Sequence, residues 1–342
     1  MRVLVVLGDP RLPDPVKRGG RFNAEDLEVV ARLREALGTL SGFSFSYVDD
    51  HASLIKTLSE QVHQRAPRPD LVFNLCDEGF GNHAARELHV PALLEVFGLP
   101  YTGAGPACLA LCARKHDVRA IAESMGIAVP DEIHVAGALD AAKCPSLPLF
   151  VKPAAADGSF GITRASIVHT LDELQTRLGE MPRAQGQGAL LQQWLPGREY
   201  SVAFLDHMGI VKALPILEVD YGGLPAALPR MLPDEAKWDP ESPYWTDVRY
   251  IRAELNGAKE ARLVSDSRRL FDRLDCRGYA RFDFREDEAG EPRLLEVNPN
   301  PGWCWDGKMN LMAGWGGFSY AEFLGAILEA GWAARLCKPH ER

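Results

Sequence analysis

The chain has 342 residues, of which 46% are hydrophobic and 25% are charged, a composition typical of a folded globular protein. This length exceeds what one simple core usually organises, so we expect two or three domains. The formal net charge of −9 argues against a broad nucleic-acid surface, because an extended phosphate footprint needs an excess of basic residues. The seven cysteines contain no Cys-x-x-Cys pair, which argues against a zinc site or a disulfide framework. No apolar run is long enough for a signal peptide or a membrane span, so we expect a cytoplasmic protein with no membrane partner.

The first part of the chain alternates between strand and helix patterns. Residues 3–7 form a continuous apolar, β-branched run, which predicts a strand buried on both faces of a parallel sheet. Further strands are expected over residues 43–48 and 71–75, and helices over 24–37, 54–61 and 86–97. This alternation predicts a βαβ domain, which we place at residues 1–112.

A second unit follows, with less regular patterning. A helix over residues 115–125 precedes a strand over 149–152 and a loop of small residues over 154–161. We expect a small central domain at residues 113–188.

The last part of the chain is rich in short strand patterns. We expect strands over residues 189–194, 199–205, 210–217, 279–284 and 293–297, and helices over 257–274 and from 319 onward. A long irregular stretch over residues 222–248 has the length of a functional loop. We place this C-terminal domain at residues 189–342.

Oxygen-bearing side chains interrupt the last two predicted strands. Alternation along a strand places Glu296 and Asn298 on one face, and pairing of the two strands would bring Asp283 to the same face. Carboxylate and amide oxygens suit Mg²⁺ that carries nucleotide phosphates. The simpler reading is a sheet rim with solvated acids.

Two further segments have chemistry that suits a nucleotide. Lys152 leaves a buried strand just before the glycine loop that contains Gly158 and Ser159, so an ammonium and backbone N–H groups could meet phosphate oxygens. The segment 190–199 ends one strand in polar groups and begins the next at Glu199, which could serve a purine and a ribose. Each segment alone also reads as an ordinary hairpin, and no Walker-type phosphate loop is present.

The order of these motifs is more informative than any one of them. Lys115, Lys152 with its glycine loop, the 192–199 segment, Arg281-x-Asp283 and Glu296-x-Asn298-x-x-Pro301-Gly302 follow one another over most of the chain. This series resembles the ATP-grasp superfamily and, within it, the D-alanine–D-alanine ligase-like branch. The resemblance implies an ATP-grasp fold, with an N-terminal parallel-sheet domain, a small central domain and a C-terminal antiparallel-sheet domain.

The resemblance also implies where ATP and metal would bind. ATP would lie between the central and C-terminal units with two Mg²⁺ ions, for which Mn²⁺ could substitute. Asp283, Glu296 and Asn298 would hold the metals. The ATP contacts implied are Lys115, Lys152, Gly158, Ser159, Gln192, Gln193, Trp194, Leu195, Glu199 and Lys237.

The activity implied is that of an ATP-dependent carboxylate–amine ligase. It would form an amide, or peptide, bond between small amino-acid-like substrates through an acyl-phosphate and release ADP and phosphate. Arg281 and the backbone N–H of Gly302 would hold the tetrahedral oxyanion, and Lys237 would cover the γ-phosphate. A homodimer is a possible assembly.

The segments that would bind the substrates differ from the family pattern. The segment with Asp77 and Glu78 replaces the His-Gly-x-x-Gly-Glu-Asp-Gly motif, and residues 303–308 replace a stretch of small hydroxyl residues. Asp306 or Lys308 would anchor the charged end of the amine acceptor, although both could equally face solvent. Glu25 could match the N-terminal Glu of the family, while a first-turn helix Glu without that role is the simpler reading. We therefore do not expect D-alanyl-D-alanine as the product.

Two alternatives to an amide ligase stay open at this point. An ATP-grasp enzyme with a different acceptor would have the same nucleotide residues. A nucleotide-binding regulatory protein would need no complete set of metal ligands.

Overall fold

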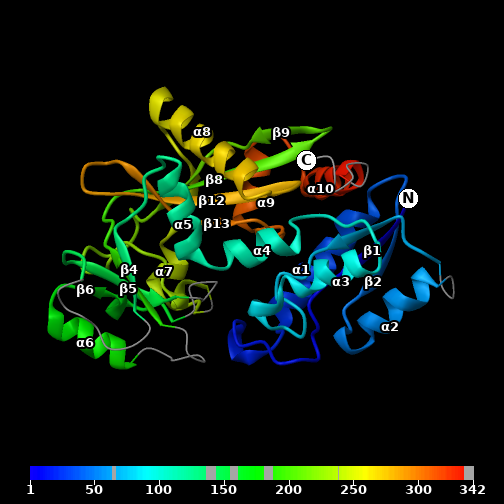
Figure 1. Cartoon of the computed structure of the whole chain (residues 1–342), viewed down its shortest axis with the longest axis horizontal. Helices are drawn as coiled ribbons and strands as arrows, with labels where there is room; N and C mark the ends of the chain where they lie inside the picture. The colour runs from blue at the N-terminus through cyan, green and yellow to red at the C-terminus, as the bar shows by residue number, and fades with distance from the viewer. Residues whose placement is uncertain (64–66, 136–143, 155–160, 181–187, 238, 335–342) are drawn as a thin grey trace.

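The computed structural model describes the chain except for residues 64–66, 136–143, 155–160, 181–187, 238 and 335–342. Three sheets organise these residues, and Figure 1 shows them as separate groups. The N-terminal unit lies at the lower right of that view, a small central sheet lies at the lower left, and the largest sheet runs across the top. The parallel, central and antiparallel units predicted from the sequence are all present. Among the described helices, none combines the length and the apolar content that a membrane span requires.

The N-terminal unit is built on a parallel sheet in the order β2-β1-β3. Its strands are β1 (Arg2–Val6), β2 (Ser44–Val48) and β3 (Leu71–Asn74), and its helices are α1 (Ala24–Gly38), α2 (His51–Val62), α3 (His89–Val96) and α4 (Pro106–Cys112), with short 3-10 helices η1 (Arg18–Gly20) and η2 (Ala84–Arg86). Asn23 caps α1 as predicted, because its side chain accepts hydrogen bonds from the backbone N–H groups of Glu25 and Asp26. Asp50 caps α2 in the same way.

The central unit is a four-stranded antiparallel sheet in the order β4-β7-β5-β6. Its strands are β4 (Glu132–Val135), β5 (Leu149–Pro153), β6 (Ile167–Val168) and β7 (Ala189–Gln193), accompanied by α6 (Leu171–Glu180) and the short η4 (Arg164–Ser166). The preceding helix α5 (Lys115–Ser124) packs instead in the core of the C-terminal sheet. The expected domain limit at residue 188 falls within this sheet, because β7 pairs with both β4 and β5. We therefore propose that the central unit extends through Gln193.

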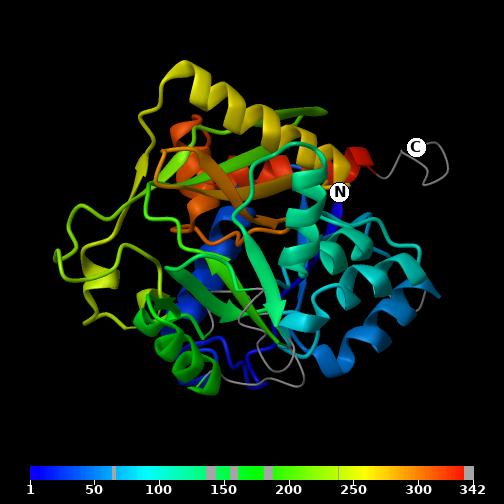
Figure 2. The same ribbon diagram turned by 60° about the vertical axis from the view of Figure 1, so that its left-hand side comes forward.

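The C-terminal unit is an antiparallel sheet in the order β11-β10-β8-β12-β13, with β9 also paired to β8. Its strands are β8 (Glu199–His207), β9 (Ile210–Ala213), β10 (Leu217–Asp220), β11 (Arg249–Arg252), β12 (Tyr279–Glu286) and β13 (Pro292–Asn298). Its helices are η5 (Asp234–Lys237), α7 (Pro243–Thr246), α8 (Gly257–Arg273), α9 (Lys308–Trp315) and α10 (Tyr320–Ala334). Figures 1 and 2 both place α8 along the outer side of this sheet, away from the central sheet.

The strand predicted over residues 210–217 is wrong in one respect. It is split into β9 and β10, which both pair with β8. Pro215 lies between them and has no N–H to donate to a strand ladder, so regular pairing cannot run through it.

Apolar packing joins the N-terminal and C-terminal units more closely than it joins either to the central sheet. One buried cluster contains Val5 of β1, Leu37 of α1, Leu217 of β10 and Phe323 of α10. The buried core of the central sheet is a separate cluster, which includes Val151 of β5. The three units therefore meet around polar side chains at their common junction.

A close contact between α10 and residue 102 gives a test of this packing. A Cβ on Gly331 would lie 2.7 Å from Thr102 Cγ2 and 3.1 Å from Thr102 Cα, whereas a Cβ on Gly314 of α9 would meet nothing within 4 Å. Overpacking costs about 1–3 kcal/mol, which outweighs a helix-propensity gain of at most about 1 kcal/mol. We expect Gly331→Ala to lower the thermal unfolding midpoint and the matched Gly314→Ala to raise it slightly. Midpoints that shift in the same direction would contradict this packing.

Candidate active site

A cavity of about 880 Å³ lies where the three units meet. Its walls come from the central sheet, from β12 and β13, from the irregular segment before β11, and from loops of the N-terminal unit. Most of the site residues predicted from the sequence line it: Asp77, Glu78, Lys115, Lys152, Gln192, Gln193, Trp194, Leu195, Glu199, Lys237, Arg281, Asp283, Glu296, Asn298, Gly302 and Lys308.

The centre of the cavity floor is a pair of facing carboxylates. In the register of β12 with β13, Asp283 stands opposite Glu296 and Arg281 stands opposite Asn298. The predicted pairing of these strands, with the three oxygen-bearing side chains on one face, is therefore confirmed. The register shifts between Asp283 and Phe284, which is a β-bulge that follows the facing pair.

Several donors hold Asp283. The Arg281 guanidinium donates from Nε to Asp283 Oδ1 at 2.9 Å and from Nη2 to Oδ2 at 2.9 Å. Ser201 Oγ donates to Oδ1 at 2.6 Å, and Asn298 Nδ2 donates to Oδ2 at 3.0 Å. Burial opposes ionisation of Asp283, but the cations Arg281 and Lys308 outweigh it and hold the pKa of this carboxyl below its ordinary value.

Glu296 is ionised for a similar reason. Its Oε2 lies 2.5 Å from Lys115 Nζ. Burial opposes the charged form, but Lys115 and Lys152 lower the pKa of Glu296 well below its ordinary value. Two adjacent carboxylates can both stay charged here because cations from other elements surround them.

The chemistry of this donor set fits a divalent cation. Asp283 and Glu296 supply ionised carboxylate oxygens and Asn298 an amide oxygen, all on one sheet face. Oxygen ligands of this kind suit Mg²⁺, which also keeps several waters. Within the described residues, no group of three or more His, Cys, Asp or Glu side chains could hold a metal ion.

Two lysines face the carboxylates from other elements. The Lys152 ammonium donates to Gln192 Oε1 at 3.2 Å, and Gln192 Nε2 donates to Glu132 Oε2 at 2.8 Å. Burial, together with the nearby cations Arg119 and Lys115, lowers the pKa of Lys152 to about 7.

Lys237 ends η5, inside the long irregular stretch of the sequence. Desolvation in the cavity lowers the pKa of Lys237 to about 8. The cation Arg281 acts in the same direction, and Glu296 opposes it. Lys152 is therefore only partly charged at neutral pH and Lys237 only partly charged at mildly basic pH, and an anion bound beside them would favour the charged forms.

An aromatic slot lies beside these lysines. The rings of Phe150 and Trp194 stack with centroids 5.8 Å apart, and the Arg285 guanidinium lies 4.8 Å from the Trp194 ring. Arg285 donates to the Leu195 carbonyl at 2.5 Å and lies 2.9 Å from Glu199 Oε2. Such a slot can take the flat face of a purine.

Loops of the N-terminal unit close the other end of the cavity. Their charged lining residues are Asp14, Lys17, Asp77, Glu78 and Glu87. Lys17 Nζ lies 3.0 Å from Asp26 Oδ1 and 3.1 Å from Glu78 Oε1. This end of the cavity is therefore acidic, while the end near the central sheet is cationic.

Some predicted residues are not in the cavity. Glu25 is exposed in the first turn of α1, and Asp306 is exposed next to the cavity-lining Gly307; neither lines the cavity. Gly158 and Ser159 lie outside the described residues.

Four charged residues of the cavity were missed by the sequence analysis: Asp14, Lys17, Glu87 and Arg285. Arg285 could have been found, because it continues the alternation of Arg281 and Asp283 along one strand face. Asp14 and Lys17 lie in an irregular segment without periodicity, so no sequence signal places them.

Comparisons with known proteins agree on the type of fold. Residues 134–329 match a family model described as D-ala D-ala ligase C-terminus. A Sinorhizobium fredii protein described as uncharacterized protein y4sG is 33% identical over 94% of this chain and 90% of its own. The D-alanine–D-alanine ligase of Haemophilus influenzae is 30% identical over 78% of this chain and 89% of its own. The crystal structure of D-alanine–D-alanine ligase from Bacillus anthracis complexed with ATP superposes with a TM-score of 0.73 at 21% identity, covering 98% of this chain and 99% of that one.

The lowered pKa values of Lys152 and Lys237 predict that polyphosphate binding takes up protons. Near pH 8 much of both side chains is neutral without ligand, and a bound triphosphate favours the charged form, so we expect proton uptake at about pH 8 and almost none at about pH 6. Calorimetric titration of a non-hydrolysable ATP analogue in buffers of different ionisation enthalpy measures this uptake. Lys152→Met should reduce it at the higher pH, and equal uptake at both pH values would contradict the assignment.

Proposed function

Since the chain belongs to the D-alanine–D-alanine ligase family and has the ATP-grasp fold, we propose that it joins an amino-acid-like carboxylate to an amine at the expense of ATP. The proposed reaction passes through an acyl-phosphate and releases ADP and phosphate. Family membership rests on the match to residues 134–329 together with the relatives that cover most of the chain.

One observation supports this proposal more than any other. The facing carboxylates Asp283 and Glu296 lie in the same cavity as cations contributed by three different elements. Those cations are Lys115 of α5, Lys152 of β5 and Lys237 of η5. Metal-binding acids beneath several ammonium groups form the arrangement that phosphoryl transfer requires, because charge spreads over the transferred group.

The nucleotide would lie at the central-sheet end. The Phe150–Trp194 slot and the backbone of residues 192–195 would receive the adenine. Glu199 would accept from the ribose hydroxyls, held in place by Arg285 and by Tyr221, whose hydroxyl donates to Glu199 Oε2 at 2.7 Å. Lys115, Lys152 and Lys237 would neutralise the phosphates.

Asp283, Glu296 and Asn298 would hold the divalent ions, which we expect to be two Mg²⁺. When bound, such ions neutralise developing charge on the phosphate oxygens. The chain itself orients the acids for this role, because Ser201, Arg281 and Lys115 fix their oxygens.

The second half-reaction would use Arg281 and Gly302. One edge of the Arg281 guanidinium, Nε and Nη2, is occupied by Asp283. This leaves Nη1 for the tetrahedral oxyanion, together with the backbone N–H of Gly302. The amine nitrogen would attack the carbonyl carbon, and phosphate would leave as the C–O bond to it breaks.

Lys308 is our candidate for a substrate carboxylate. It begins α9, lines the cavity and lies 3.5 Å from Ser201 Oγ and 5.3 Å from the Tyr250 ring centroid. A cation at a helix N-terminus whose N–H groups are uncapped offers a carboxylate two kinds of donor. Asp306 is exposed and does not line the cavity, so it is not a candidate for a substrate contact.

The products provide the first test of the reaction. We expect turnover to require Mg²⁺ or Mn²⁺ and to yield ADP and phosphate in equal amounts. Chromatography of the nucleotides after incubation with ATP and candidate substrates measures this, with a chelator as the metal-free control. Stoichiometric AMP would exclude an acyl-phosphate.

Substitutions at the carboxylate–lysine centre provide the second test. Lys152→Ala and Glu296→Gln should each lower kcat by about 10²–10³, because each removes a preorganised charge contact at the phosphates or metals. Phosphate release at saturating substrate measures the rate, and circular dichroism checks the fold. Glu288→Gln is the matched control, since that exposed carboxylate lies at the β12–β13 turn outside the cavity. Near-normal rates in the first two variants would place the nucleotide elsewhere.

A further inference from the structure

The two ends of the cavity have opposite charge. Lys115, Lys152, Lys237, Arg281 and Lys308 line the part that faces the central sheet and β12. At the other end, the N-terminal unit contributes four carboxylates, and Lys17 is the one Lys or Arg that it contributes within the described residues. A ligand that spans the cavity therefore meets phosphate-binding groups at one end and acids at the other.

The ammonium group of Lys17 is already paired with carboxylates of the protein. Its ammonium is held between Asp26 and Glu78, at 3.0 and 3.1 Å. Asp77 has no Lys or Arg within ion-pair distance in the described part of the chain. Glu78 Oε2 is buried and has no hydrogen-bond partner among the described residues. Asp14 is only 2% exposed, although it lines the cavity. A buried carboxylate without a nearby cation or a full set of hydrogen bonds costs free energy, and a cationic ligand would remove that cost.

The ionisation behaviour of the same acids agrees with this reading. Burial and the neighbouring Glu78 raise the pKa of Asp77 well above its ordinary value, and burial raises the pKa of Asp14. Without a ligand, Asp77 and Asp14 are therefore not stabilised in their charged forms.

The acidic wall lies beside the proposed reaction centre. A Cβ built on Gly302 would lie 3.8 Å from Asp77 Oδ2. Gly302 lies four residues after the end of β13, and its backbone N–H is our candidate for holding the oxyanion. A group bound against Asp77 is therefore close to the carbonyl that the acceptor amine would attack.

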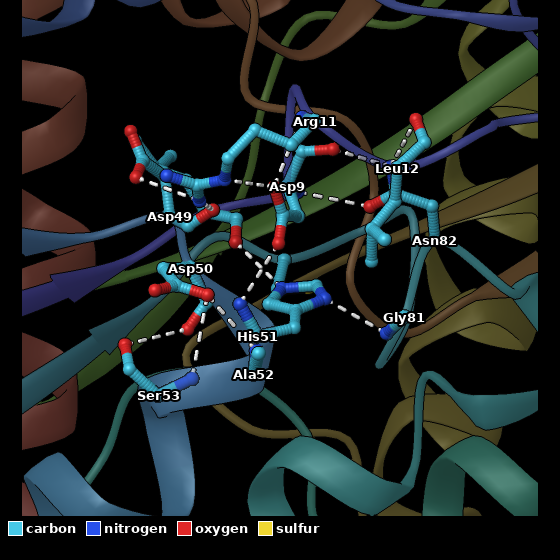
Figure 3. A network of polar contacts seen from close by, with 12 residues as sticks. Asp9, Arg11, Leu12, Asp49, Asp50, His51, Ala52, Ser53, Gly81 and Asn82 are labelled. Atoms are coloured by element: carbon cyan, nitrogen blue, oxygen red, sulfur yellow. Dashed lines mark hydrogen bonds and ion pairs between the residues drawn. The ribbon is translucent and has the colours of Figure 1, made fainter.

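Figure 3 shows how the loops that carry this wall are fixed to the sheet. Asp9 Oδ2 accepts from the His51 backbone N–H at 3.0 Å, and Asp9 Oδ1 accepts from Arg11 Nε at 2.8 Å. Asn82 joins the two loops, because its Oδ1 accepts from Asp9 N at 2.9 Å and its Nδ2 donates to the Asp9 carbonyl at 2.7 Å.

The His51 ring completes this connection. Nδ1 accepts from the Gly81 backbone N–H at 2.7 Å, so Nε2 carries the proton and donates to the Leu7 carbonyl at 2.9 Å. The segments with Asp14 and Asp77 are thus held in place before a ligand binds, which reduces the ordering cost of binding.

We propose that the amine acceptor is a basic compound with two cationic groups, of the lysine, ornithine or diamine class. Its reacting amine lies beside Asp77 and Gly302, and its second cation lies among Asp14, Glu78 and Asp77. This inference rests on the proposed ligase function and adds the chemical class of the acceptor to it. A zwitterionic acceptor such as alanine brings a single ammonium, which cannot neutralise both Asp14 and Asp77.

The test is a panel of amines with the full-length protein, ATP and Mg²⁺. Lysine, ornithine, putrescine, alanine and glutamate, both enantiomers of each amino acid, are supplied singly and in pairs. Phosphate release gives the rate, and mass spectrometry identifies the product. We expect kcat/KM for the basic acceptors to exceed that for alanine at least about tenfold, the effect of one charge-assisted contact.

Variants separate the wall from the rest of the site. Asp77→Asn and Asp14→Asn should raise the KM of the basic acceptor about tenfold or more and leave the KM of ATP unchanged. Glu60→Gln is the matched control, because that carboxylate lies on α2 outside the cavity and pairs with Lys56. A thermal-shift titration with lysine or alanine, in the presence of a non-hydrolysable ATP analogue, reports binding without turnover.

The possible outcomes distinguish this inference from the proposed function. Phosphate release that favours alanine or glutamate, or acceptor KM values unchanged in both variants, would overturn the basic acceptor and leave the ligase intact. Failure of every pair to yield ADP would count against the ligase function itself. In that case, a lysine-specific thermal shift that is lost in Asp77→Asn would still support a binding site for cations at the acidic wall. The absence of such a shift would overturn that site.

Discussion

Two carboxylates that face each other in a buried part of a sheet can both be charged only if cations surround them. Asp283 and Glu296 are such a pair, and the cations come from outside their own hairpin, apart from Arg281. Lys115 comes from α5, which packs on β13, whereas Lys152 comes from the central sheet. That sheet must therefore be docked for Lys152 to contribute to the ionisation of Glu296. The arrangement of the three units is in this sense an electrostatic requirement of β12 and β13.

The same requirement explains why buried arginines occur where the units meet. Arg119 of α5 is almost fully buried and lies 2.6 Å from Glu132 Oε2 of the central sheet, while its Nη1 donates to the Leu295 carbonyl of β13. Arg285 makes the corresponding connection on the other side of the cavity, between Glu199 and the Leu195 carbonyl. The Arg119 guanidinium thus satisfies acceptors from two units, and that of Arg285 satisfies acceptors from two segments, a role that the planar Arg fork serves better than a lysine ammonium.

The parts of this site that could be predicted are those with a regular repeat. Alternation along β12 and β13 placed Asp283, Glu296 and Asn298 on one face, and the strand pairing that this needed is present. The position of β7 could not be predicted in the same way, because a short apolar strand fits either neighbouring sheet and only tertiary pairing decides. Asp14 and Lys17 were missed because an irregular loop has no period, and its path depends on distant partners such as Asn82. The half of the cavity that we propose for ATP follows from local patterns, whereas the half that we propose for the acceptor depends on long-range contacts.

The separate core of the central sheet has a consequence for motion. Val151 and its buried neighbours pack within that sheet, while α1, α10 and β10 share one continuous core. Toward the larger core the central sheet presents half-buried side chains such as Phe150 and Ile167. A tilt of the central sheet would therefore expose little apolar surface. Water or a ligand could replace the protein partners of the charged side chains at its edge. Opening and closing of the cavity should therefore come mainly from movement of the central sheet, while the acidic end, which lies on the larger core, keeps its shape.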